Sequence, residues 1–186
     1  MKRTFLAIAI PFTPALQAVW GELQEAFAAI PTRWVSPSTL HVTLAFIGPT
    51  TPAMEASICT LGTAVAAHHV PFRMVVQGVG TFGKPNPKVL WLGVGSGADL
   101  LTRLASDICR ALTDVGVALS VQNYTPHVTL ARFRGAVPPE APARAVAAFG
   151  SLRLLPTEVS EVVFYESILM DGRPPLYRPI ASFPLG

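Results

Sequence analysis

The sequence predicts an α+β domain built of two lobes, and three observations carry this prediction. Segments with strand-like and helix-like hydrophobic spacing are mixed along the chain. Several strand-like segments are separated only by short turns rich in Gly and Pro, a pattern typical of antiparallel hairpins. No linker divides the 186 residues, a length that suits one domain covering residues 1–186. We therefore expect antiparallel sheets covered by helices.

The first half of the chain predicts two strands and two helices. The start of the chain, with charged residues at 2–3 and an apolar run at 5–10, resembles a signal peptide, but the run is short and Pro11 breaks it, so we expect a buried strand at 3–10. Apolar residues at helical spacing predict a helix at 14–29. A strand is expected at 40–47, ended by Gly48 and Pro49. A second helix is expected at 52–67, with Pro52 acceptable near its start.

The second half predicts two hairpins separated by helices and one strand. Strands at 72–79 and 88–94 are joined by the turn at 83–87. A helix at 99–115 is followed by a strand at 127–133, where Pro126 is tolerated at the edge. A shorter Ala-rich helix is expected at 140–149. The last strands are expected at 159–169 and 177–183, around the turn at 171–175.

Composition excludes several protein classes. Hydrophobic residues make up 51% of the chain, charged residues make up 13%, and mean hydropathy is +0.45, which excludes a disordered chain. No stretch approaches the ~18 uninterrupted apolar residues of a membrane span. The net charge of +3 is compatible with a phosphate-bearing partner but does not identify one. Cys59 and Cys109 have no CxxC neighbour, so we expect reduced thiols and a cytoplasmic location.

One pentapeptide occurs twice, each time inside an expected strand. His-Val-Thr-Leu-Ala at 41–45 recurs unchanged at 127–131. Side chains alternate between the two faces of a strand, so His and Thr share one face in each copy while Val and Leu enter the core. We expect a cleft between two lobes, with both His-Thr pairs facing inward. The alternative is a pair of buried structural His-Thr hydrogen bonds.

Two imidazoles across a cleft are suited to general acid–base catalysis. A neutral His accepts a proton from the attacking group while a protonated His gives one to the leaving group, and an unperturbed pKa near 6.5 makes both forms available around neutrality. The threonine hydroxyls can donate to anionic oxygens where charge develops. This combination fits cleavage of a phosphodiester without a metal.

These residues resemble the 2H phosphoesterase superfamily and, within it, the RNA 2′,3′-cyclic phosphodiesterases, historically called 2′–5′ RNA ligases. The resemblance extends over nearly the whole chain and includes segments 5–11, 40–48, 80–93 and 126–132. Segment 167–177 also resembles the family, but its usual Gly-Pro pair is split as Gly172-Arg173-Pro174-Pro175. The substrate contacts of that loop therefore stay open.

The resemblance implies a pseudo-twofold, bilobal fold with two antiparallel sheets facing a central cleft and helices on the outside. It implies hydrolysis of an RNA 2′,3′-cyclic phosphodiester to a 2′-phosphomonoester, with His41 as proton donor and His127 as proton acceptor. Thr43 and Thr129 would hold the phosphate. The identical copies do not by themselves assign acid and base. Run in reverse, the same chemistry joins a 5′-hydroxyl to a cyclic phosphate without ATP, and the chain has no Lys-x-Asp-Gly motif of ATP-dependent ligases.

The two copies differ five residues after the His, where Phe46 and Arg132 stand. The resemblance implies that Arg132 contacts the phosphate and that Phe46 stacks on a nucleobase. Strict alternation points both side chains away from the His-Thr face. Only strand twist or a β-bulge would turn them toward it.

We expect RNA with a 2′,3′-cyclic phosphate end, tRNA fragments included, as the substrate of a monomeric enzyme with no cofactor, no metal and no membrane partner. Two alternatives are an esterase acting on small cyclic nucleotides such as ADP-ribose cyclic phosphate and a non-catalytic RNA-end-binding protein.

Other motifs in the sequence do not indicate a second site. A GxGxxG match at 78–83 is followed by Pro85 and Pro87, which do not start a helix. His68 and His69 lack partners at metal-ligand spacing, which favours a role at a helix end. The arginines that could follow an RNA backbone along the cleft are Arg132, Arg134, Arg173 and Arg178.

Overall fold

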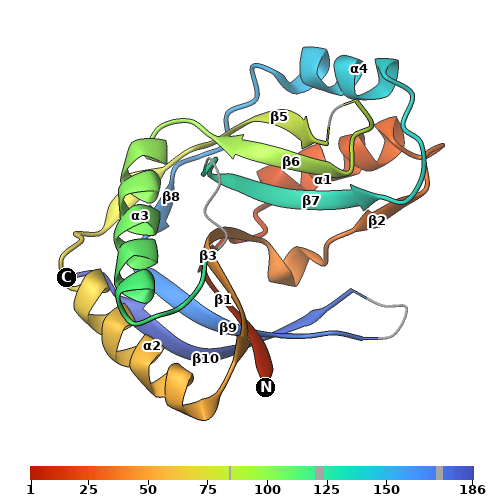
Figure 1. Ribbon diagram of the computed structural model, residues 1–186. Helices are drawn as coiled ribbons and strands as arrows, with labels where there is room; N and C mark the ends of the chain where they lie inside the picture. The colour runs from red at the N-terminus through yellow and green to blue at the C-terminus, as the bar shows by residue number, and fades with distance from the viewer. Residues whose placement is uncertain (84, 120–123, 171–173) are drawn as a thin grey trace.

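The computed structural model describes residues 1–83, 85–119, 124–170 and 174–186 and has four α-helices around antiparallel strands (Figure 1). The main sheet has the order β10-β9-β1-β3-β7-β6-β5, with β2 paired to β7, while β4 pairs with β8. The strands are β1 (Lys2–Ala9), β2 (Thr32–Trp34), β3 (His41–Thr50), β4 (Phe72–Met74), β5 (Val76–Phe82), β6 (Val89–Val94), β7 (His127–Phe133), β8 (Thr157–Val159), β9 (Glu161–Ile168) and β10 (Leu176–Pro184). The helices are α1 (Pro14–Ala26), α2 (Pro52–Ala66), α3 (Ala98–Asp114) and α4 (Glu140–Phe149), with a 3-10 turn at Pro37–Thr39.

The main sheet consists of two antiparallel halves that meet at one residue pair. Strands β10, β9, β1 and β3 form one half, and β7, β6, β5 and β2 form the other. The halves are joined where Val42 of β3 pairs with Val128 of β7. The α+β, bilobal architecture is thus confirmed, with the refinement that the two expected sheets are continuous through this pair.

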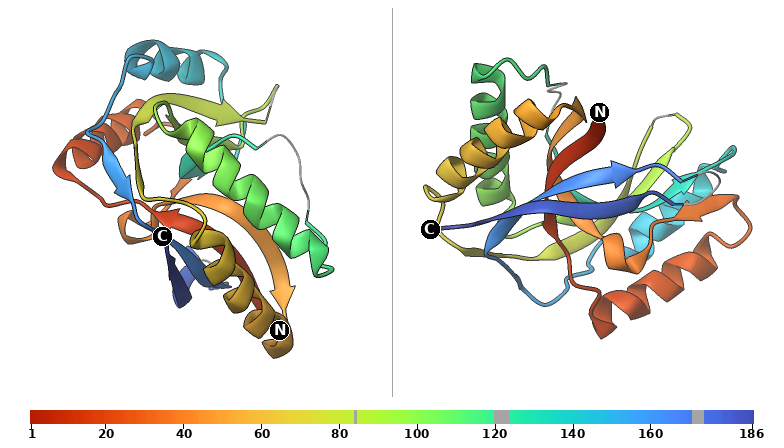
Figure 2. Two further views of the ribbon diagram at one scale, coloured as in Figure 1. Left: turned by 90° about the vertical axis from the view of Figure 1, so that its left-hand side faces the viewer. Right: turned by 90° about the horizontal axis from the view of Figure 1, so that it is seen from below.

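Each half of the sheet carries two helices on its outer side, as Figure 2 shows from two directions. Helices α2 and α3 pack on the half that contains β3, β9 and β10, whereas α4 packs on β5. Helix α1 lies on this second half, where its C-cap residue Phe27 meets Phe133 of β7 and Trp20 meets Trp34 of β2. The chain passes repeatedly between the lobes, so neither lobe is a continuous segment. One domain over residues 1–186 stays a prediction.

Local signals explain where the helices begin. The side chains of Thr13 and Thr51 accept hydrogen bonds from the third residue after each of them, which caps α1 and α2. Proline occupies the first turn of both helices, where its missing N–H costs nothing. Helix α3 starts after Gly97, whose φ of 84° favours glycine. Within the described part of the chain, no helix has the length and apolar character needed to cross a bilayer.

The structure differs from the sequence expectation mainly in short elements. The strand expected at 72–79 is two strands, because β4 pairs with β8 whereas β5 pairs with β6. Strands β2 and β8 span three residues each, too few for periodicity to reveal. Helix α1 ends at Ala26, three residues before the expected end. The tip of the turn at 171–175 lies partly outside the described residues.

Candidate active site

The two copies of the repeated pentapeptide are related by the pair at which the sheet halves meet. Val42 and Val128 are the second residues of the two copies, and they pair in antiparallel register. On either side of this pair, the register brings His41 toward Thr129 and Thr43 toward His127. The pseudo-twofold axis therefore passes between the two valines, and both are fully buried.

Each catalytic candidate imidazole is held by a backbone carbonyl two residues before it. The Nδ1 atom of His41 lies 2.7 Å from the carbonyl oxygen of Thr39, and Nδ1 of His127 lies 2.7 Å from that of Thr125. A carbonyl oxygen only accepts, so Nδ1 carries the proton in both rings. The free Nε2 is then an acceptor in the neutral ring and a donor in the imidazolium. The sequence analysis did not predict these carbonyl contacts, although a threonine precedes the His by two residues in both copies, at Thr39 and Thr125.

A β-bulge at the same place in both copies turns Phe46 and Arg132 to the His-Thr face. In β3, Leu6 pairs with Ala45 and Ala7 with Thr43, which leaves Leu44 as the extra residue. In β7, Leu90 pairs with Ala131 and Trp91 with Thr129, which leaves Leu130. The following residues, Ala45 and Ala131, are buried, and the next two, Phe46 and Arg132, are exposed. The bulge thus resolves the conflict with strict alternation.

All six candidate site residues line one cavity of about 170 Å³. They share it with residues from the strands β1, β9 and β10 and from the segment after β2. The sequence analysis assigned no role to these four additional residues, although three of them lie in or at the ends of the segments 5–11 and 167–177 that carry the family resemblance. They are Phe5, Val35, Ser167 and Tyr177.

The surroundings of the two histidines break the symmetry of the repeat. The ring centroid of His41 lies 5.0 Å from that of Phe5 and 5.3 Å from that of Tyr177, and the His41 and Tyr177 rings meet edge to face. The ring of His127 lies edge-on to Phe82 at 4.8 Å and 6.2 Å from Trp91. These aromatic walls hold each ring in place and remove water from one of its sides.

Burial lowers the pKa of both histidines below its ordinary value of 6.5. The carbonyl contacts oppose this shift, because they favour the protonated ring. A second charge lowers the pKa further in each case: Arg132 acts on His127, and His127 itself acts on His41. Arg132 therefore favours a neutral His127, and a neutral His127 leaves His41 free of like-charge repulsion.

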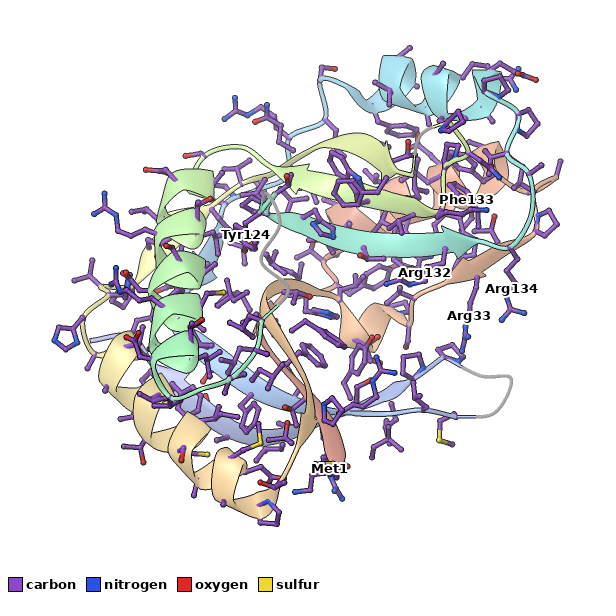
Figure 3. All side chains as sticks on the ribbon, in the orientation of Figure 1. Met1, Arg33, Tyr124, Arg132, Phe133 and Arg134 are labelled. Carbon is purple, nitrogen blue, oxygen red and sulfur yellow. The ribbon has the colours of Figure 1, made fainter. Side chains whose placement is uncertain are left out.

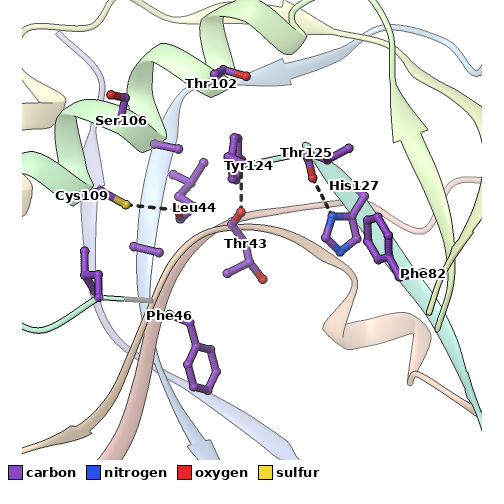
Figure 4. A pocket seen from close by; sticks show the side chains of 13 residues that line it. Thr43, Leu44, Phe46, Phe82, Thr102, Ser106, Cys109, Tyr124, Thr125 and His127 are labelled. Carbon is purple, nitrogen blue, oxygen red and sulfur yellow. Dashed lines mark hydrogen bonds between the residues drawn. The ribbon is translucent and has the colours of Figure 1, made fainter. Parts of the chain in front are cut away.

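The larger hollow beside the histidines has about 580 Å³ and is mainly apolar (Figure 4). It shares Thr43, Phe46 and His127 with the smaller cavity and extends to α3, where Ser106 and Cys109 line it. Tyr124 lines it too and donates a hydrogen bond to the carbonyl oxygen of Thr43 at 3.1 Å, which ties the segment before β7 to β3. Among the described residues that line this hollow, none except His127 brings a titratable nitrogen or a carboxylate.

Other candidates from the sequence lie away from the cavity. His68 donates to the carbonyl of Ala64 in the last turn of α2, and His69 lies 3.0 Å from Asp107 of α3. Arg178 is paired with Glu166, and Arg173 lies outside the described residues. Within residues the structure describes, no three His, Cys, Asp or Glu side chains gather as metal ligands would.

Comparison with known proteins identifies the family. A family model described as the 2′-5′ RNA ligase superfamily matches residues 12–168. The chain belongs to this superfamily. Two relatives are named RNA 2′,3′-cyclic phosphodiesterase. The one from Geobacillus stearothermophilus is 36% identical over 196 aligned residues, covering all of this chain and 58% of the relative. The one from Aeropyrum pernix is 34% identical over 157 residues, 83% of this chain and 87% of the relative.

This chain spans little more than half the length of its Geobacillus relative. Solved structures share its fold over nearly the full length. A protein from Thermus thermophilus aligns with a TM-score of 0.75 at 24% identity, covering 98% of this chain and 97% of that one. Escherichia coli LigT complexed with 3′-AMP aligns with a TM-score of 0.70 at 22% identity, covering 99% and 98%.

Proposed function

We propose that this superfamily member hydrolyses RNA 2′,3′-cyclic phosphodiesters to 2′-phosphomonoesters by acid–base catalysis between two histidines. The observation that carries the proposal is the pair of imidazoles with Nδ1 bound to a carbonyl, both lining one cavity beside two threonines. Relatives named for this activity, at 34–36% identity, support the same reaction.

His127 acts as the proton acceptor. Its Nε2 takes a proton from water as the water oxygen bonds to phosphorus, and the nearby Arg132 charge favours the neutral ring that this step requires. His41 acts as the proton donor: its Nε2 proton passes to the 3′ oxygen as the bond between phosphorus and that oxygen breaks. Thr43, Thr129 and Arg132 donate to the phosphate oxygens, where negative charge develops.

The large apolar hollow takes the nucleobase of the terminal nucleotide. Phe46 is 53% exposed and lines both this hollow and the smaller cavity that holds the two histidines. A flat, uncharged base can stack on its ring there while the ribose presents its cyclic phosphate to the histidines. The free thiols Cys59 and Cys109 are consistent with a cytoplasmic enzyme acting on RNA ends such as those of tRNA fragments.

The same site supports ATP-independent ligation. A 5′-hydroxyl in place of water would lose its proton to His127 and attack the same phosphorus, leaving a 2′–5′ linkage and a free 3′-hydroxyl. No cofactor is needed, because the new bond from phosphorus to the 5′ oxygen replaces the bond from phosphorus to the 3′ oxygen, and His41 gives its proton to the 3′ oxygen.

The test is turnover of an RNA oligonucleotide with a 2′,3′-cyclic phosphate end, in EDTA, by the wild type and by His41→Ala and His127→Ala. We expect a 2′-phosphate end from the wild type and losses of at least ~10²-fold in both variants. A wild type that is inert, yet is stabilised against thermal unfolding by the oligonucleotide, would instead be an RNA-end-binding protein.

A further inference from the structure

Two arginines face each other across neighbouring strands beside the catalytic cavity. Arg33 of β2 pairs directly with Arg132 of β7 in antiparallel register, so both side chains leave the same face of the sheet. Figure 3 shows them between β7 and the hairpin of β9 and β10. Like charges placed directly opposite destabilise a strand pair. Within the described ranges neither guanidinium forms an ion pair with a carboxylate.

The two charges border a separate hollow of about 120 Å³, lined in part by Ser36, Thr39 and Pro175. Its position next to the active site is defined by shared residues. Val35, Arg132 and Tyr177 line both this hollow and the catalytic cavity. Both arginines also act on the Tyr177 hydroxyl: burial raises its pKa, and the two positive charges oppose that rise.

The three hollows adjoin through shared lining residues and together make a groove with different chemistry at its two ends. The apolar hollow shares Thr43, Phe46 and His127 with the catalytic cavity, but in the part of the chain that is described it shares no lining residue with the arginine hollow. The catalytic cavity therefore lies between an apolar end and a basic end. A ligand that follows this groove carries an uncharged flat group, then a reactive phosphate, then a second anion.

An RNA chain with a cyclic phosphate at its 3′ end has this order of groups. Beyond the terminal base and cyclic phosphate, its next anion is the phosphodiester on the 5′ oxygen of the terminal ribose. We propose that Arg33, which lies beside the Arg132 that holds the terminal phosphate, binds this preceding phosphodiester, so that the enzyme selects the end of an RNA chain over a mononucleotide. The inference rests on the proposed function, because the terminal cyclic phosphate must occupy the catalytic cavity.

The test compares kcat/KM for a nucleoside 2′,3′-cyclic phosphate with that for a dinucleotide ending in the same nucleoside. We expect the wild type to prefer the dinucleotide by about tenfold or more, since charge-assisted hydrogen bonds to a phosphate would be added. Arg33→Gln should lose that preference while retaining wild-type kcat/KM on the mononucleotide. Arg144→Gln, which removes a charge from the exposed face of α4, is the matched control and should keep the preference.

A dinucleotide with an uncharged methylphosphonate linkage isolates the role of the anion. The wild type should treat it like the mononucleotide, and Arg33→Gln should not distinguish it from the natural dinucleotide. Equal wild-type turnover of mononucleotide and dinucleotide would overturn this inference and leave the proposed function standing. Equal losses by Arg33→Gln on both substrates would overturn it too, because Arg33 would then act on the terminal phosphate or on the fold. A wild type inert on both substrates would refute the proposed function itself.

Discussion

His41 and His127 stand in identical pentapeptides and are bound by identical carbonyl contacts, yet their neighbours differ. His41 lies against Phe5 and Tyr177. His127 lies against Phe82, and the charge of Arg132 lowers its pKa. The lobe of His41 contributes Phe46 to the cavity at the position where the lobe of His127 contributes Arg132.

The comparison separates what a repeated motif does from what its surroundings add. The repeat supplies a proton-transfer group, a hydroxyl and a bulge in each lobe, so the two halves of the site have the same geometry. One aromatic and one cationic residue after the bulge then make the halves unequal. In the proposed mechanism, the same five residues supply both an acid and a base because the charge of Arg132 lowers the pKa of His127 and not that of His41.

The largest effect should separate the roles of the two histidines. We expect both His→Ala variants to lose at least ~10²-fold on an RNA cyclic phosphate. When the bridging 3′ oxygen of the substrate is replaced by sulfur, the leaving thiolate needs no proton. His41→Ala should then recover to within about tenfold of the wild type, whereas His127→Ala should not. Recovery of His127→Ala instead would exchange the two roles.

The next effect concerns the two hydroxyls that face the cavity. Thr43→Val and Thr129→Val keep the shape of the side chain and remove the donor, so each should lower kcat/KM by roughly 10- to 100-fold. Each threonine is only half-buried, so thermal unfolding should change little. Unequal losses would show that the phosphate sits nearer one lobe; an unchanged kcat/KM in both variants would contradict their role.

A smaller effect is expected from the packing beneath His127. A Cβ atom added at Gly80 would lie 2.2 Å from the Trp91 ring, which packs against Phe82 and His127. Gly80→Ala should therefore lower the free energy of unfolding by about 1–3 kcal/mol and reduce kcat/KM. Gly21→Ala in α1, which meets nothing within 4 Å, is the control and should stabilise the protein. Denaturant unfolding measures both, and a neutral Gly80→Ala would show that the indole can move freely.

The smallest effect is on the pH dependence. The proposed mechanism requires a protonated His41 and a neutral His127, and both pKa values are lowered from 6.5, so kcat/KM should peak below pH 6.5. It falls at higher pH as His41 loses its proton and at lower pH as His127 gains one. In an NMR titration of the free protein, Arg132→Gln should raise the pKa of His127, and Arg134→Gln should not. A His127 titration unmoved by Arg132→Gln would remove the charge asymmetry between the lobes.

Much of this fold could be predicted from the sequence because its longer elements carry clear periodicity. The four helices and the strands that hold the repeat lie close to their expected positions. Strands β2 and β8 could not be found, since three residues carry no period. Arg33 was missed for the same reason: its significance depends on which strand β2 pairs with, and nothing local states that partner.

The sequence by itself determined which side chains share one face, because a duplicated His-x-Thr on a strand already puts imidazole and hydroxyl together, and these are the side chains to which we assign the proposed chemistry. The tertiary structure decided how those faces meet, through the Val42–Val128 pair, and which neighbours distinguish them. It also turned Phe46 and Arg132 inward by bulges that depend on the register with β1 and β6. Register and pairing are properties of two strands together, and a single segment of sequence does not contain them.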